Sequence, residues 1–466
     1  MRRSSSSDNS GTRATNPGLT RPSGYVPHGG PLPSPPQEEL PLPLTSALCI
    51  LACLLIGTAD ALTHGQYSLP SLLLVLMAAA IAWAASSHSF ATIVLPPSRA
   101  RLVVAIAFLD CLLAAIRFRG GLYGTGVPLA ISIALVIAAA AAALLAATLG
   151  LVNQALLISI VLIGGAAVAM IISSPAPLID TWEMLQAAAR GLLAGHNLYT
   201  QHWRPHLPGQ ATAYGYFPGP AVVLAPFYAL FRDVRYGILL STLTSAVLIA
   251  RISRHPLAAV FGTLFLLYPY FTFSIEQSWI EPITLLTLLL LAWSLRRHKT
   301  GYATLLLAAL LTFQQYSLIF VPLVAASKGF GIRRTALSLA LSATFTLPWV
   351  IATPHLFFHA AILYSLHYVF AYQSLSLFHL LADLTGGLGY VALVLGMLLA
   401  LTISMVRIRK DASFLMGCSV TLVTLNLFNK ISRFNEWELA AGLILAAGAE
   451  ALTLSTLRED IPPPYS

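Results

Sequence analysis

The chain has 466 residues, of which 57% are hydrophobic and only 9% are charged, with a formal net charge of +9. An ordinary soluble domain has about a quarter charged residues, so this chain cannot cover a water-facing surface with polar groups. Composition excludes a soluble enzyme, a disordered protein and a disulfide scaffold. It indicates an all-α, polytopic transmembrane helix bundle of about 11–14 membrane helices, with loop helices on the extracytoplasmic side.

Residues 1–40 are rich in Ser, Pro, Gly and Arg without apolar periodicity, which predicts a disordered cytoplasmic tail. After this tail, apolar runs of nearly bilayer-spanning length alternate with basic or Gly- and Pro-rich breaks. We expect residues 41–152 to form N-terminal membrane helices of unclear role, 153–456 a catalytic membrane module and 457–466 a cytoplasmic tail. The expected spans lie near 44–62, 69–85, 102–116, 127–149, 155–172, 236–250, 257–273, 283–295, 302–326, 337–351, 390–406, 414–427 and 439–454.

Lys and Arg residues orient these spans, because cytoplasmic loops carry an excess of positive charge. The best orientation requires 217–231 to be re-entrant or interfacial, which its three prolines favour. It also requires 302–326 to form two short helices that meet outside near Gln314, and it leaves Arg117 on the unfavoured side. The clusters placed inside are Arg99/Arg101, Arg251/Arg254, Arg296/Arg297/Lys299, Lys328/Arg333/Arg334 and Arg407/Arg409/Lys410.

Three longer segments then face outward, namely 173–235, 353–384 and 429–437, and we expect the function to reside there. The acidic residues are unevenly placed, and seven of the 17 map to the outward face. Asp180 opens a stretch whose apolar positions follow one helical stripe and which should end at Gly195. The outward acidic residues are Asp180, Glu183, Asp233, Glu276, Glu281, Glu436 and Glu438.

Asp180 has two compatible interpretations. A structural role would make it the N-cap of the helix, with Glu183 completing a capping box. A catalytic role would make it a general base that accepts a proton from an acceptor hydroxyl at the membrane surface.

The outer segment continues from Asp180 with a spaced aromatic residue, Trp182, a G-x-x-x-Y pattern that ends at Tyr199, and Tyr-Phe-Pro at 216–218. Further on come Ile-Glu-Gln at 275–277 and Tyr-Gln-Ser-Leu at 372–375. In order and spacing these elements resemble GT-C-type integral-membrane glycosyltransferases, and within them the bacterial polyprenyl-phosphate-mannose-dependent mannosyltransferase branch. The resemblance covers about residues 155–456.

This resemblance implies a hexosyltransferase of the cell membrane. It would move mannose or another hexose from a polyprenyl-phosphate donor to a hydroxyl of a lipid or glycan acceptor at the extracytoplasmic face, with Asp180 as the general base. The chain has Glu276 where the family has Gly before Gln, and Gln314 and Gln315 where a Lys often follows the later span. These departures leave the identity of the donor open.

The leaving phosphate needs cationic or hydrogen-bonding partners. Lys430 and Arg433, in a compact loop between spans, are the preferred candidates, although cations at such positions often only snorkel to the interface. Outer tyrosines could stack on sugar rings, but an interfacial aromatic belt has the same composition. The expected substrate-binding residues are Glu183, Arg190, Tyr199, Tyr216, Glu276, Gln277, Gln373, Lys430 and Arg433.

No metal, cofactor or nucleic-acid partner is expected, since the histidines are dispersed and the chain has neither an HExxH nor a GxxxxGK[ST] motif. The alternative function is a polytopic transporter or a lipid-linked-saccharide flippase. Such a protein needs ionisable groups near mid-membrane depth, where Asp110 is the only clear carboxylate. A structural subunit is a third possibility. Convergence of Asp180, Glu276 and the Lys430 loop at the outer face would favour the enzyme.

Overall fold

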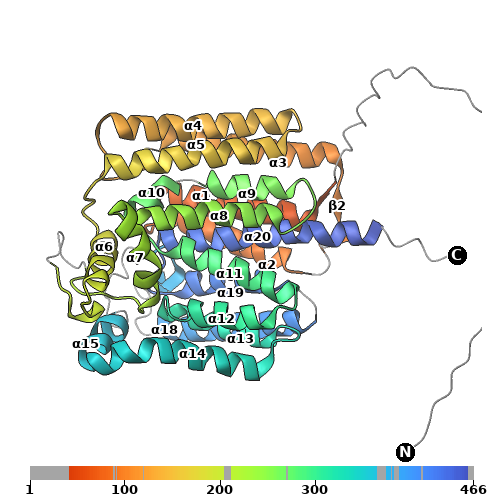
Figure 1. Ribbon diagram of the computed structural model, residues 1–466. Coiled ribbons are helices and arrows are strands. Elements are labelled where there is room, and N and C mark those ends of the chain that lie inside the picture. The colour runs from red at the N-terminus through yellow and green to blue at the C-terminus, as the bar shows by residue number, and fades with distance from the viewer. Residues whose placement is uncertain are drawn as a thin grey trace, which may run out of the picture. The chain divides into compact units, whose positions relative to one another are not determined.

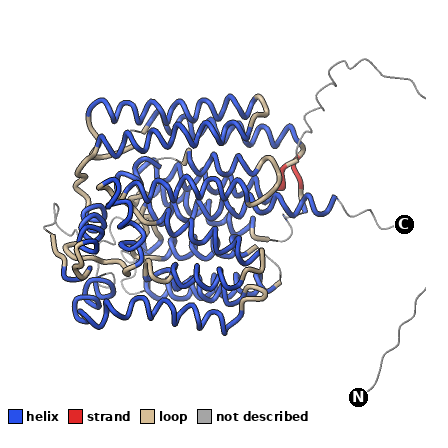
Figure 2. Tube along the Cα trace, viewed as in Figure 1, coloured by secondary structure: helices blue, strands red, loops and turns tan. Residues whose placement is uncertain are grey.

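The computed structural model describes residues 41–87, 90, 92–118, 120–203, 211–268, 271–364, 374–378, 380–381, 388–410 and 413–459. Within these ranges the chain is almost entirely helical, which confirms the all-α class (Figures 1 and 2). The one sheet in this part of the chain is an antiparallel pair of two-residue strands, β1 (Leu42–Pro43) and β2 (Val94–Leu95). The tail predicted at 1–40 lies outside the described residues.

The first half of the chain forms antiparallel pairs of long helices, and the shorter helices α6 (Asp180–Leu193) and α7 (Gly219–Phe231) lie at one end of them (Figure 1). Its helices are α1 (Leu44–Thr63), α2 (Leu69–Ala85), α3 (Pro97–Arg117), α4 (Gly126–Thr148), α5 (Val152–Ser173), α6 (Asp180–Leu193), the 3-10 helix η2 (Leu198–Thr200), α7 (Gly219–Phe231), α8 (Arg235–Arg251), α9 (Ala258–Leu266) and α10 (Phe271–Gln277).

The second half continues the antiparallel pattern with more broken helices. These are α11 (Glu281–Arg296), α12 (Thr300–Leu310), the 3-10 helix η3 (Gln315–Phe320), α13 (Val321–Ala326), α14 (Gly331–Ala352), α15 (Pro354–Phe357), the π-helical turn η4 (Phe358–Leu363), α18 (Leu388–Arg409), α19 (Phe414–Phe428) and α20 (Phe434–Glu459).

Local sequence signals explain several of these ends. The hydroxyl of Ser68 accepts a hydrogen bond from the Ser71 N–H at 3.2 Å, and a proline in the first turn favours the start of α2. Ser413 caps α19 in the same way. After α1 the chain turns at Gly65, with φ +71°, where a Cβ atom would lie 2.4 Å from the backbone N of Phe434. Only glycine fits this approach between the end of α1 and the start of α20.

Small residues allow the central helices to approach closely, as is common in membrane bundles. Ser46 of α1 donates a hydrogen bond to the Gly448 carbonyl of α20 at 2.8 Å. At Gly262 of α9 an added Cβ would lie 2.5 Å from the Ala246 carbonyl oxygen of α8. Because α1 packs directly on α20, the expected boundary near residue 152 does not coincide with a break in packing, and residues 39–466 form one compact unit.

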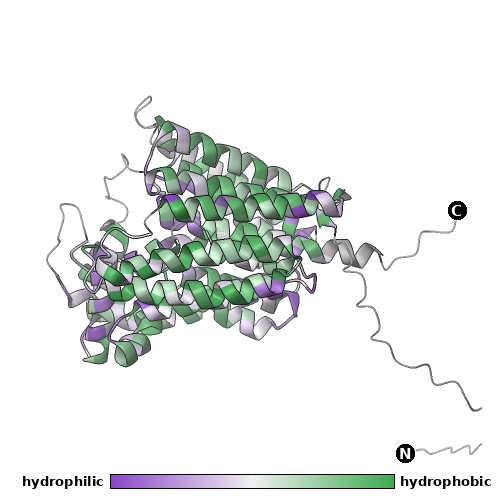
Figure 3. Cartoon of the chain, turned by 90° about the horizontal axis from the view of Figure 1, so that it is seen from above, coloured by the Kyte–Doolittle hydropathy of each residue, from purple (hydrophilic) through white to green (hydrophobic). Residues whose placement is uncertain are grey.

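Four of the described helices, α1, α4, α5 and α14, are long and apolar enough to cross a membrane. The bent pairs α7–α8 and α9–α10 would raise this number to six. Several other helices are shorter, such as α2 with 17 residues and α19 with 15, and the larger expected number of spans stays a prediction. Figure 3 shows hydrophobic residues along the helices and hydrophilic residues toward their ends.

Two expected breaks in helix direction are present, while the re-entrant or interfacial placement of 217–231 stays a prediction. Helices α7 and α8 meet at 112°, so 217–231 does not continue straight into the next helix. Helix α12 ends at Leu310, and η3 starts the return from Gln315, so 302–326 is broken where it was predicted to be.

Successive helices alternate in direction, so their turns lie at two ends of the bundle (Figure 1). Helices α6, α7 and α15 gather at the end opposite the β1–β2 pair, which we call the loop end. The expected cytoplasmic clusters lie at the starts of α3 and α14 and at the ends of α8, α11 and α18. Chain direction places all of them at the other end, which we call the basic end.

Candidate functional site

Asp180 is the first residue of α6 and lies, half-buried, at the loop end. The N-cap is Ile179, and no side chain caps the helix, so the expected N-cap role of Asp180 is wrong. Instead its Oδ2 accepts a hydrogen bond from the Ala211 N–H at 2.9 Å. The carboxylate therefore holds the segment that starts at residue 211 against α6, and this contact fixes its orientation.

Helix α6 ends as expected, because Gly195 adopts φ +78° directly after the C-cap Ala194. Arg190 is exposed in the last turn. Ten residues of helix separate it from Asp180, which is about 15 Å along the axis. Glu183 is half-buried, one turn from Asp180. The structure therefore keeps Glu183 near Asp180 and places Arg190 at the far end of the helix.

Tyr199 is completely buried rather than facing a ligand. Its hydroxyl donates to the Tyr216 carbonyl at 3.0 Å, and its ring makes edge contacts with Tyr214 and Phe357, at centroid distances of 5.7 and 4.9 Å. Tyr199 thus packs against the 211–218 segment and stabilises its position. The half-buried Tyr216 is the tyrosine of this pair that reaches the site.

Glu276 is fully buried at the end of α10. Its carboxylate accepts three consecutive backbone N–H groups, from Leu122 at 2.6 Å, Tyr123 at 2.9 Å and Gly124 at 2.7 Å. The Gln277 amide donates a fourth bond at 3.1 Å. Protein donors thus surround the expected substrate-binding group, which anchors the turn between α3 and α4. The Gln277 carbonyl accepts from the Thr181 hydroxyl and so joins α10 to α6.

Glu281 lies at the start of α11 and is 2% exposed. Its Oε1 accepts from the Asn435 amide at 2.9 Å and from the Gln314 amide at 3.3 Å, with the Tyr316 hydroxyl at 3.5 Å. Glu436 is half-buried beside them, and its Oε2 accepts the Arg433 N–H at 2.9 Å. We call these residues the acid–amide cluster, which comprises Glu281, Gln314, Tyr316, Asn435 and Glu436.

The cluster was not among the expected substrate-binding residues. The signal for it was available, since Glu281 and Glu436 both stand just before apolar runs that begin at the same face. The hydrogen bonds of Glu281 with Gln314 and Asn435 span 33 and 154 positions in sequence, and no local pattern predicts such contacts.

The loop that carries Lys430 and Arg433 is fixed by a neighbouring segment. The Ser432 N–H donates to the Ser374 hydroxyl at 2.7 Å, and the Leu375 N–H donates to the Ser432 carbonyl at 2.7 Å. Burial lowers the pKa of Lys430. Gln373 lies outside the described residues, but Ser374 and Leu375 place the end of that element against this loop.

The Tyr216 side chain is influenced by the charges of both Asp180 and the acid–amide cluster. Burial raises the pKa of its phenol well above the ordinary value, and the negative charges of Glu281 and Asp180 raise it further. The pKa of Tyr123 is raised by burial and then by Glu276 and Asp180. Each tyrosine therefore lies close to two carboxylates. Asp180, Glu276 and the cluster next to the Lys430 loop converge at the loop end.

A buried ion pair positions the start of this site. Arg235 is completely buried, and its Nη2 lies 2.6 Å from Oδ2 of Asp233. Its Nη1 donates to the Ser174 carbonyl at 2.9 Å and to the Ser174 hydroxyl at 3.0 Å, and the guanidinium lies 5.8 Å from the Trp182 ring centroid. Arg235 thus ties the turn between α7 and α8 to the segment that leads into α6.

Replacing Arg235 with Ala is expected to lower the free energy of unfolding by about 3–5 kcal/mol, because Asp233 and Ser174 lose the guanidinium with which they pair. Thermal unfolding of the purified protein in detergent measures the loss. The matched control is Arg232→Ala, an exposed arginine three positions away whose guanidinium lies 5.9 Å from the Tyr228 ring centroid. Equal effects of the two substitutions would contradict the anchoring role.

The sequence predicts Asp110 as the only clear carboxylate within the membrane helices, but the structure has a second one, Asp60. Asp60 is completely buried in the last turn of α1, where its Oδ2 accepts from the Tyr268 hydroxyl at 2.6 Å. This position is at the loop end of α1 rather than at its middle. Asp60 is therefore a further buried carboxylate near the site.

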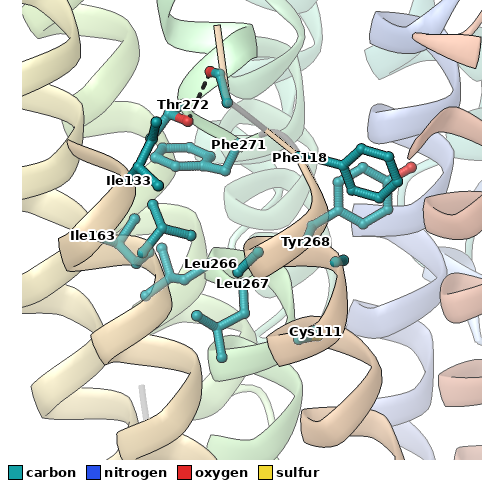
Figure 4. Close-up of a pocket in the computed structure, with 13 residues that line it drawn as sticks. Cys111, Phe118, Ile133, Ile163, Leu266, Leu267, Tyr268, Phe271 and Thr272 are labelled. Carbon is teal, nitrogen blue, oxygen red and sulfur yellow. Dashed lines mark hydrogen bonds between the residues drawn. The ribbon is translucent and has the colours of Figure 1, made fainter. Parts of the chain in front are cut away.

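An apolar pocket lies beside Tyr268, between α3, α4, α5 and α9 (Figure 4). Residues such as Cys111, Ile133 and Ile163 line it, and the Thr272 hydroxyl donates to the Gly120 carbonyl at 2.9 Å at its edge. The pocket has a cavity volume of about 30 Å³, which is enough for about two water molecules. Such a small, apolar pocket does not suit polar chemistry.

Comparison of the chain with protein-family models, curated proteins and solved structures finds no match. Among the described residues, no group of three or more His, Cys, Asp or Glu side chains is arranged to hold a metal ion. What the loop end can do chemically is therefore judged from its carboxylates, amides, phenols and cations.

Proposed function

We propose that the chain is a membrane glycosyltransferase that moves mannose or another hexose from a polyprenyl-phosphate donor to the hydroxyl of a lipid or glycan acceptor. In this proposal the loop end faces the extracytoplasmic side of the cell membrane, because the basic clusters lie at the opposite end. The observation that carries the proposal is the convergence of Asp180, the acid–amide cluster and the Lys430 loop at one end of the bundle. The Thr181 hydroxyl joins the start of α6 to the Gln277 carbonyl, and Asn435 and Glu436 join the Lys430 loop to Glu281.

In the proposed reaction Asp180 takes the proton of the acceptor hydroxyl. The acceptor oxygen forms a bond to the anomeric carbon, and the bond from that carbon to the phosphate oxygen breaks. The electron pair leaves with the polyprenyl phosphate. The hydrogen bond from the Ala211 N–H holds one oxygen of Asp180 and leaves the other for the acceptor. A single base without a nucleophilic carboxylate suits inversion at the anomeric carbon.

The leaving phosphate gains negative charge, so a positioned cation stabilises it. We assign this role to Lys430 and Arg433, because the bonds between Ser374, Leu375 and Ser432 fix their loop beside Glu436. Arginine is suited to bidentate binding of phosphate. Arg190, exposed at the far end of α6, is less suited to this role.

Transport of a lipid-linked saccharide is the competing proposal, and the buried Asp60–Tyr268 pair is the observation that favours it. A transporter binds its substrate near mid-depth, between related halves. Asp60 instead lies within one turn of the loop end, like Glu276, Glu281 and Glu436. The distribution of carboxylates is therefore more typical of chemistry at the membrane surface.

The proposal is tested with the full-length protein in lipid nanodiscs. Radiolabelled polyprenyl-phosphate mannose and polyprenyl-phosphate glucose are offered with a panel of glycolipid and soluble glycoside acceptors, and nucleotide sugars serve as comparison donors. We expect label in a new glycoside from a polyprenyl-phosphate hexose and none from nucleotide sugars. Folded protein that transfers no sugar from either lipid donor would overturn the proposal.

A further inference from the structure

The acid–amide cluster has one buried oxygen that the protein leaves unsatisfied. Oε1 of Glu281 receives the Asn435 and Gln314 amides, whereas Oε2 has no hydrogen-bond partner among the described residues. Glu281 is 2% exposed, so water reaches it poorly. A buried acceptor without a partner costs about 1–3 kcal/mol, and more if it is charged. Such an oxygen is expected to have a donor in the working state of the protein.

The groups around this oxygen suit hydroxyl ligands better than a cation. Two carboxylates supply acceptors, and two amides with the Tyr316 phenol supply donors. A sugar hydroxyl donates one hydrogen bond and accepts others, which matches this mixture. A cation would need the amide oxygens, but the Gln314 and Asn435 nitrogens are the atoms that face Glu281.

The cluster also lies within reach of Asp180. The Thr181 hydroxyl, next to Asp180, donates to the Gln277 carbonyl, four residues before Glu281. The charges of Glu281 and Asp180 both raise the pKa of the Tyr216 phenol. The Gln315 amide donates to the Gly215 carbonyl at 3.2 Å and ties η3 to the segment that carries Tyr216. Tyr216 and Tyr316 are both half-buried there. Their rings offer surfaces on which a sugar can stack.

We propose that the acid–amide cluster is a sugar-binding subsite, in which a ring hydroxyl of the hexose donates to Oε2 of Glu281 while the neighbouring Glu436 and Asn435 bind the adjacent hydroxyls. This inference rests on the proposed function for its substrate class. It adds a specificity-determining residue, Glu281, to the base Asp180. The subsite selects sugars by the hydroxyl at one ring position, because a sugar without it leaves Oε2 unsatisfied.

The test measures binding and not transfer. Thermal unfolding of the full-length protein in nanodiscs is followed with methyl α-mannoside, methyl α-glucoside and methyl α-galactoside, and with their monodeoxy analogues. A ligand that binds the folded state raises the unfolding temperature, and at a given ligand concentration the rise is larger for a tighter ligand. We expect one parent glycoside to raise it and one of its deoxy analogues to bind about tenfold more weakly, a difference of about 1.4 kcal/mol.

The variant Glu281→Gln keeps the size of the side chain and should bind the parent glycoside as weakly as wild type binds the critical deoxy analogue. Both proteins should bind that analogue equally, because the lost interaction is the same. Glu436→Gln is the second variant and should also weaken binding. Glu450→Gln is the matched control, a carboxylate near the basic end that pairs with Arg296, and it should bind like wild type.

Three results would overturn the subsite. The first is that no parent glycoside shifts the wild-type unfolding temperature, and the second is that Glu281→Gln binds the glycoside as wild type does. The third is a shift that depends on Mg²⁺ or Ca²⁺ and disappears when a chelator is added. The last result would assign the cluster to a cation. Failure of the proposed function gives a different result: wild type would bind the glycoside but transfer no sugar. Asp180→Asn should keep this binding, because Asp180 acts in transfer and not in the subsite.

Discussion

Replacing Asp180 with Asn is expected to lower the rate of sugar transfer by about 10²–10⁴-fold, the usual contribution of a positioned general base. The amide cannot take the proton of the acceptor hydroxyl. Its side-chain oxygen can still accept the Ala211 N–H, which Asp180 binds at 2.9 Å. The fold should therefore survive, and the unfolding temperature should stay close to that of wild type.

The matched control for this experiment is Asp110→Asn, the same substitution at a half-buried aspartate inside α3, about 10 Å along the axis from the end of that helix. Its transfer rate should equal that of wild type. Initial rates with a polyprenyl-phosphate hexose measure both variants. If Asp180→Asn retained the wild-type rate, the general base would have to be another group, and Glu281 and Glu436 would be the nearest candidates.

Replacing Glu276 with Ala is expected to lower the free energy of unfolding by about 3 kcal/mol or more, because it removes three hydrogen bonds to a carboxylate, each worth about 1.5–3 kcal/mol. The carboxylate accepts the N–H groups of Leu122, Tyr123 and Gly124 at 2.6–2.9 Å. Without it, the turn between α3 and α4 loses its anchor on α10. Chemical unfolding of the purified protein measures the change.

Glu276→Gln is the graded control, because it keeps one acceptor oxygen and should lose less stability than Glu276→Ala. Gln277→Ala removes only the 3.1 Å side-chain bond to Glu276 and should lose least. Unchanged stability in Glu276→Ala would contradict the anchoring role. The group would then be available to a ligand, as the sequence elements had suggested.

Local sequence signals predicted much of the fold. The apolar stripe and Gly195 gave the extent of α6, which runs from Asp180 to Leu193. Three prolines predicted the break at α7, which meets α8 at 112°. The distribution of Lys and Arg predicted that the basic turns lie at one end of the bundle. Each of these features depends on residues close together in the chain, so composition and spacing are sufficient.

The site could be predicted only in part, because tertiary contacts decide the role of each side chain. Asp180 binds Ala211, 31 positions away, and not the first turn of its own helix. Glu276 binds a turn more than 150 positions earlier. Tyr199 looks like an interfacial residue in sequence but is buried under Tyr216. Residue type and spacing contain no information on such partners.

The side of the membrane on which transfer occurs tests the central claim most directly. Full-length protein is reconstituted into sealed proteoliposomes, with its orientation read from a membrane-impermeant maleimide at Thr212→Cys, an exposed loop-end position; the four native cysteines are buried. A soluble acceptor glycoside is then supplied on one side at a time. We predict new glycoside only when the acceptor is on the side that labels residue 212. Product formed from the basic-end side, or a lipid-linked sugar that crosses the bilayer without a new glycosidic bond, would contradict it.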